Sequence, residues 1–101
     1  MSPATLSLIV MGIQDDAARL FADVLGKRAG QVGMAYAMEP SVWVQDHREA
    51  KVYFTVDGMG NLVAKFVRDG QRPIRVDFFP TVAGANALAD FLLEQIAEES
   101  Q

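Results

Sequence analysis

The stretch KVYFTVDGMGNLVAKFV, residues 51–67, decides the fold, because it joins two runs of alternating apolar residues through the segment DGMGN. In the first run Val52, Phe54 and Val56 alternate with more polar residues, and the second run alternates in the same way after Asn61. Alternation over roughly four to eight residues is typical of a β-strand with one buried face. The stretch therefore predicts a β-hairpin, provided that DGMGN is a turn.

The two glycines of DGMGN also raise the question of a nucleotide site. A dinucleotide-binding fingerprint needs a third glycine or an alanine at position 63, where this chain has Val63. It also needs a helix that receives the pyrophosphate, whereas the residues after Asn61 alternate like a strand. No Lys-Ser or Lys-Thr pair follows, as a P-loop requires. DGMGN is therefore interpreted as a hairpin turn, in which glycine supplies a positive φ.

Three further segments with strand-like patterns surround the hairpin: QVGMAYAM (31–38), SVWVQ (41–45) and IRVDFF (74–79). The expected core-facing residues of the first and the last segment are Val32, Met34, Tyr36, Met38, Ile74, Val76 and Phe78. Short strands joined by short turns indicate an antiparallel meander of about four or five strands.

Helical patterns flank the strands on both sides. Ser2 followed by Pro3 suits a helix start, because a hydroxyl caps free N–H groups and proline lacks one. The core side of this helix is expected to carry Leu6, Ile9, Val10, Ile13, Ala17, Leu20, Phe21 and Val24, with a stop at Gly26 or Gly30. After Pro80, Thr81 is the expected cap of a second helix with the apolar residues Val82, Ala85, Leu88, Ala89, Leu92 and Ile96.

The start of the first helix has a second interpretation. The β-branched Ile9 and Val10 favour a strand over residues 6–11, after which a helix would begin at Asp15 and Asp16. Gly12 would then be a turn residue, rather than a helical glycine that costs about 1 kcal/mol. The sequence leaves residues 6–11 open between helix and strand.

These patterns predict one α+β domain over residues 1–101. An N-terminal helix, the antiparallel meander and a C-terminal helix would form a two-layer sandwich, with the helices on one face of the sheet. No apolar run approaches the roughly 20 residues of a membrane span. The N-terminus lacks the basic start and cleavage site of a secretory signal. We therefore expect a cytoplasmic protein without a membrane partner.

Residues that carry chemistry are sparse. The chain has no cysteine, and His47 is its only histidine, flanked by Asp46 and Glu49 in one polar segment. Neighbouring residues of one loop rarely converge on a metal ion, and no second histidine completes a ligand set. No serine stands on a nucleophile elbow that would support a Ser-His-Asp triad. We expect no catalytic residue, no metal site and no cofactor, and hence a non-enzymatic protein.

The sheet face that points away from the helices is expected to be unusually apolar. By parity it carries Tyr53, Thr55, Val63, Lys65, Val67, Arg75 and Asp77, with Trp43 and Phe79 as further candidates. We expect Asp77 to pair with Lys65 or Arg75. Contiguous apolar surface usually marks an interface with another protein.

The outer side of the first helix leads to the same expectation. It would carry Leu8 and Met11 together with Ala4, Ala18 and Ala22. We therefore expect a regulatory, adaptor or chaperone-like protein that binds another protein, or itself as a homodimer. The expected contact residues are Leu8, Met11, Trp43, Tyr53, Lys65 and Arg75.

Two alternatives stay open. The aromatic and basic residues of the outer sheet face would suit stacking of single-stranded nucleic acid. A net charge of −4 makes nucleic acid the less favoured partner, because its binding relies on cationic side chains. A small apolar ligand could instead lie between the sheet and the helices, against Met34, Met38 and Phe54.

Overall fold

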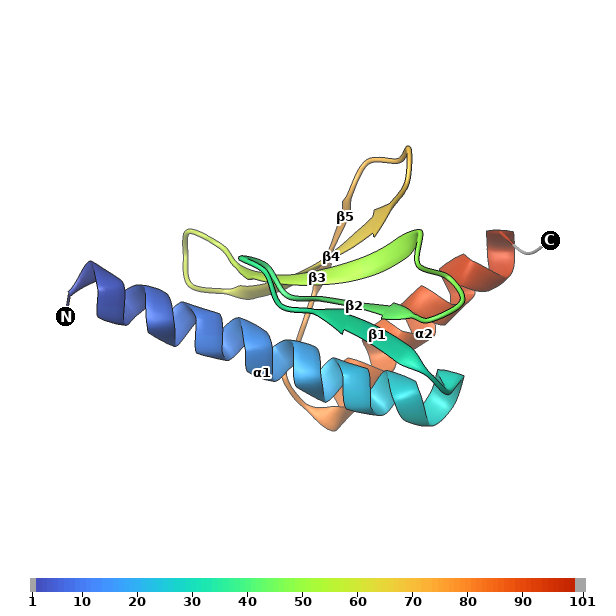
Figure 1. Ribbon diagram of the computed structural model, residues 1–101, viewed down its shortest axis with the longest axis horizontal. Helices are drawn as coiled ribbons and strands as arrows, with labels where there is room; N and C mark the ends of the chain where they lie inside the picture. Colours follow the sequence, from blue (N-terminus) through green and yellow to red (C-terminus); the bar gives the residue numbers. More distant parts are fainter. Residues whose placement is uncertain (1, 100–101) are drawn as a thin grey trace.

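The computed structural model describes residues 2–99, which form a helix, five strands and a second helix in chain order (Figure 1). The elements are α1 (Pro3–Ala29), β1 (Val32–Ala35), β2 (Ser41–Val44), β3 (Ala50–Val56), β4 (Leu62–Arg68), β5 (Ile74–Asp77) and α2 (Val82–Glu99). All strand pairs are antiparallel, and the sheet order is β1-β2-β3-β4-β5. The predicted α+β meander between two helices is confirmed.

Helix α1 is continuous, so the alternative of a strand over residues 6–11 is wrong. The side chain of Ser2 accepts a hydrogen bond from the backbone N–H of Thr5 (3.2 Å), and Pro3 occupies the first turn. At the other end Gly30 has a φ of 84°, and its N–H donates to the carbonyl of Gly26. These caps and the helical spacing between them outweigh the strand preference of two β-branched residues.

The core lies between one face of the sheet, the second half of α1, and α2. The ring of Phe54 on β3 lies 5.6 Å from that of Phe21 on α1 and 5.1 Å from that of Phe78, measured between centroids. On the same face of the sheet Phe66 of β4 meets Phe91 of α2 edge-on at 5.5 Å. Aromatic pairs at these distances favour tilted and edge-on contacts, which join the two layers.

The core side of α1 begins later than the sequence suggests. Leu6, Ile9 and Ile13 are exposed, although the helical spacing predicts them in the core. Ala18 is fully buried and Ala22 is partly buried, although they were expected on the outer side. A helix of 27 residues is roughly 40 Å long, and its first part extends beyond the sheet (Figure 1). Helical spacing alone does not reveal where the covering layer ends.

Strand β1 is shorter than its pattern predicts. It ends at Ala35, which is paired with Ser41 of β2, and the chain then turns through Tyr36–Pro40. The prediction that Tyr36 and Met38 face the core is wrong, because 57% and 89% of their surfaces are exposed. At the other edge Ile74, also predicted to face the core, exposes 43% of its surface, while Phe78 is buried just after β5.

The segment DGMGN is the turn between β3 and β4, as predicted. One carboxylate oxygen of Asp57 accepts hydrogen bonds from the backbone N–H groups of Met59 and Asn61, both at 2.9 Å. Gly60 has a φ of 85°, which a residue with a side chain rarely adopts. The N–H bond from Asn61, with a smaller contribution from Met59, lowers the pKa of Asp57. The glycines therefore shape a hairpin and not a phosphate site.

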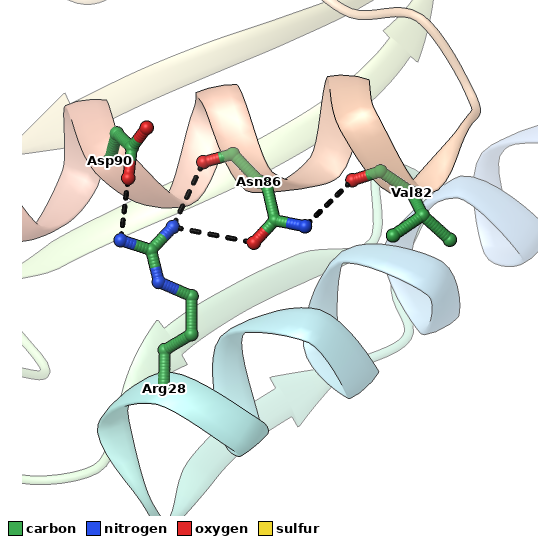
Figure 2. Close-up of polar contacts among 4 residues, drawn as sticks. All are labelled: Arg28, Val82, Asn86 and Asp90. Atoms are coloured by element: carbon green, nitrogen blue, oxygen red, sulfur yellow. Dashed lines mark hydrogen bonds and ion pairs between the residues drawn. The ribbon is translucent and has the colours of Figure 1, made fainter.

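Helix α2 begins as predicted, because the side chain of Thr81 accepts a hydrogen bond from the N–H of Gly84 (3.0 Å). Arg28, near the end of α1, connects the two helices (Figure 2). Its guanidinium donates to the backbone carbonyl of Asn86 (3.0 Å) and forms an ion pair with Asp90. The packing of α1 on α2 is thus reinforced by one side chain that joins the two helices.

Candidate protein-binding surfaces

The first part of α1 carries an exposed apolar surface that no other element covers. Between 44% and 69% of the surface is exposed at Leu6, Leu8, Ile9, Met11 and Ile13. The first charged side chain of the sequence is Asp15, so residues 5–13 contain none. We call residues 5–13 the apolar overhang, since Figure 1 shows this part of α1 extending past the sheet. A helix that is apolar on all sides is normally buried, so we expect this exposed surface to bind another molecule.

A groove of about 640 Å³ lies between the overhang and the loop that connects β1 to β2. Its lining is mostly apolar: Leu6, Val10, Met11, Gln14, Tyr36, Ala37 and Met38. No charged side chain is among these lining residues. The groove has room for several large apolar side chains of another molecule.

Arg19 fixes the loop side of this groove. Its Nε donates to the hydroxyl of Tyr36 (3.4 Å), and its guanidinium lies 5.8 Å from the centroid of the tyrosine ring. The hydrogen bond favours the charged guanidinium and raises the pKa of Arg19. Tyr36, which lines the groove, is therefore held beside α1 by Arg19.

The predicted contact residues of α1 belong to this surface. Met11 lines the groove, and Leu8 is exposed on another side of the same helical segment. Sequence analysis missed Tyr36 and Met38 as surface residues, because it assigned them to the buried face of a longer strand. The signal that could have found the surface is the absence of charge before Asp15, which a fully solvated helix rarely shows.

The structure also brings together three predicted contact residues of the outer sheet face. Tyr53 of β3 lies opposite Lys65 of β4, which lies opposite Arg75 of β5. The ammonium group of Lys65 forms an ion pair with Glu39, with an N–O distance of 2.8 Å. The predicted pairing of Asp77 with Lys65 or Arg75 is wrong for the described residues, since Asp77 lies opposite Val63 and Lys65 is held by Glu39.

Trp43 lies on this outer face, as the alternation suggests, but it is covered. Only 9% of its surface is exposed. The ammonium of Lys51 lies 4.8 Å and the guanidinium of Arg48 lies 5.6 Å from the ring centroid. Gly33 of the neighbouring strand lies directly opposite the tryptophan. Because basic side chains already occupy its ring face, Trp43 offers no open platform for a base or for an apolar anchor.

Beside the tryptophan is a hollow of about 360 Å³ that is lined by Arg48, Glu49, Lys51, Tyr53, Val67 and Asp69. Two cationic and two anionic side chains face it, so it has no marked preference for either charge. This balance does not favour a phosphate backbone, whose binding relies on an excess of positive charge.

The residues suggested for a small apolar ligand do not share one cavity. Phe54 is fully buried in the aromatic core, whereas Met38 is largely exposed at the groove. His47 lies 3.6 Å from a carboxylate oxygen of Glu49, in the loop after β2. Within residues 2–99 no group of three or more His, Cys, Asp or Glu side chains is placed to hold a metal ion.

Comparison with known proteins adds no further assignment. No protein-family model, no curated protein and no solved structure matches the chain. None of the helices in the described part of the chain has the length and apolar character needed to cross a membrane. Function therefore has to be argued from the surfaces themselves.

Proposed function

We propose that this protein acts by binding an apolar, helix-forming segment of another protein in the groove between α1 and the β1–β2 loop. One observation carries the proposal: the apolar overhang is solvated, although it contains no charged residue. Leaving such a surface in water is unfavourable, and burying a large apolar side chain contributes about 1.5–3 kcal/mol. A partner in the groove that covers Leu6 and Met11 of the overhang would gain that free energy.

The shape of the groove indicates the kind of partner. One wall is a helix and the other a loop anchored by Tyr36, and the lining between them is mostly apolar. An amphipathic helix that binds in a groove inserts apolar side chains spaced three or four residues apart. Met11 and Met38 suit such a role, because unbranched side chains adjust to different neighbours. A regulatory, adaptor or chaperone-like role in the cytoplasm stays part of this proposal.

A peptide selection tests the groove without a known partner. A phage library of random 12-residue peptides would be selected on the wild-type protein, and the affinity of the recovered peptides measured by titration. We expect amphipathic, apolar sequences whose affinity falls about tenfold or more in Met11→Glu and in Met38→Glu, since a buried unpaired charge is costly. Met59→Glu is the matched control, because Met59 is as exposed as Met38 but lies on the β3–β4 turn.

The selection can also contradict the proposal. Peptides that bind all three variants as tightly as they bind the wild type would show that the preferred surface lies elsewhere. Charged peptides that respond to Lys65→Glu and Arg75→Glu would point to the outer sheet face instead.

A further inference from the structure

We propose that a second copy of this chain packs against the side of α1 that faces away from the groove. The two helices would run antiparallel, with Ile9 of each copy at the twofold axis. This surface differs from the groove, so the dimer and the binding of a partner protein are separate properties. Leu6 alone borders both surfaces.

The residues on this side of α1 form a symmetric pattern. Positions 2, 5, 9, 12 and 16 are separated by steps of three and four, so they lie along one side of the helix. With Leu6 and Ile13 included, the set maps onto itself when the helix is reversed about Ile9: Ser2 meets Asp16, Thr5 meets Ile13, and Leu6 meets Gly12. All seven of these residues are exposed. A twofold interface requires such a self-complementary surface, because the same patch contributes both halves.

Leu6 and Gly12 are complementary in size. Gly12 lies in the interior of a helix, where it is less favourable than alanine, and no other group lies within 4 Å of the position of a Cβ there. Packing inside one copy therefore does not explain this glycine. In the antiparallel pair, the leucine of one copy lies level with the glycine of the other, and the small glycine lets the two helices approach closely.

The charges are complementary as well. Free N–H groups give the start of a helix a partial positive charge. The antiparallel arrangement places this end beside Asp16 of the other copy, whose carboxylate makes only an exposed contact with Arg19 at 3.8 Å. No charged side chain occurs between Ser2 and Gln14, so no like charges repel each other at the centre of the dimer interface.

The available area matches a weak but specific dimer. Leu6, Ile9 and Ile13 each expose roughly half of their surface. With their small neighbours they offer on the order of 500 Å² per copy, so two copies would bury roughly 1,000 Å², the lower end for specific interfaces. Figure 1 shows the start of α1 beyond the sheet, which leaves room for a second body.

Sedimentation equilibrium of the full chain over micromolar concentrations tests the association. We expect a dimer whose dissociation constant rises about 30-fold or more in Ile9→Glu, because two carboxylates would meet at the axis. Met59→Glu and Met38→Glu are expected to change it less than about twofold, and Ile9→Glu to leave peptide binding in the groove intact. A wild-type chain that stays monomeric at several hundred micromolar would overturn the proposal.

Disulfide trapping tests the relative orientation of the two helices. Because the chain has no native cysteine, only the introduced cysteines can form a disulfide. A mixture of Thr5→Cys and Ile13→Cys chains should form the mixed disulfide, while neither variant should cross-link efficiently with itself. The opposite result would mean parallel helices and would overturn the arrangement.

Gly12→Ala supplies an independent check. It should raise the Tm of the monomer by several degrees, since alanine stabilises helices, and yet weaken the dimer. An unchanged or stronger dimer would show that the helices do not approach closely at this position.

Discussion

Gly33 of β1 lies directly opposite Trp43 of β2, and the indole ring fills the space that a side chain at position 33 would need. A methyl group there would overlap the ring, so Trp43 or the edge strand must move. We expect Gly33→Ala to lower the free energy of unfolding by about 1–3 kcal/mol, the usual effect of overpacking. Urea denaturation monitored by tryptophan fluorescence measures this loss of stability, since Trp43 is the only tryptophan.

Gly58→Ala is the control for replacing a glycine. Nothing lies within 4 Å of its Cβ position, and its φ is not positive. It is expected to change stability by less than about 0.5 kcal/mol, as surface substitutions usually do. Equal effects of the two substitutions would show that the indole does not limit position 33.

Local patterns predicted most of the fold. Ser2, Thr81 and Gly30 are capping signals that act within one turn, and each stands at a helix end in the structure. The alternation around Phe54 and Phe66 fixes the buried face of two paired strands, because a shift by one residue would expose every apolar side chain. These elements were predictable because the interactions that define them span only a few residues.

The errors arise where distant segments meet. Whether Ile9 is buried depends on where the sheet ends beneath α1, and helical spacing contains no such information. Likewise Lys65 pairs with Glu39, 26 residues away, which no strand alternation indicates. The candidate surface could be predicted in part: Leu8 and Met11 were identified, whereas Tyr36 and Met38 came from the structure.

Arg68 is a buried cation at the end of β4. Its guanidinium donates to the backbone carbonyl of Gln95 in α2 (3.1 Å) and lies 5.3 Å from the ring centroid of Phe66. It thus links the sheet to the last turns of α2, where a positive charge is favourable. We expect Arg68→Ala to destabilise the protein by about 2–3 kcal/mol, through a lost charged hydrogen bond and lost packing.

Arg72→Ala is the matched control for Arg68, because Arg72 is exposed in the turn before β5. Its effect should stay below about 0.5 kcal/mol. Thermal denaturation by circular dichroism compares the two variants. Equal losses would mean that net charge, rather than the contact with α2, is responsible.

Replacing Arg28 is expected to destabilise the protein more than replacing its ionic partner Asp90. Arg28→Met removes both the hydrogen bond to the carbonyl of Asn86 and the ion pair with Asp90, whereas Asp90→Asn removes only the charge. We expect losses of about 1–2 kcal/mol for Arg28→Met and at most about 1 kcal/mol for Asp90→Asn, since exposed ion pairs contribute little. In 1 M salt the second loss should shrink and the first should largely persist. Equal losses that both vanish in salt would contradict this order.

Asp57 makes the stability of the hairpin depend on pH. Hydrogen bonds from the N–H groups of Asn61 and Met59 lower its pKa in the folded state. A carboxylate with a depressed folded pKa stabilises the protein above its unfolded pKa of about 3.9, and this contribution is lost as the pH falls through the folded value. At pH 7 the folded protein therefore has the full benefit of the ionised side chain, and below about pH 4 the benefit declines.

Asp57→Ala should consequently lower the Tm at pH 7, and its difference from the wild type should narrow progressively as the pH is reduced from about 4 toward 2. Asp69→Ala removes one negative charge from the neighbouring β4–β5 turn and serves as the control for net charge. Thermal denaturation of the three proteins across this range provides the measurement. A difference between Asp57→Ala and the wild type that stays constant from pH 7 to pH 2 would show that the N–H bonds do not depend on the ionised carboxylate.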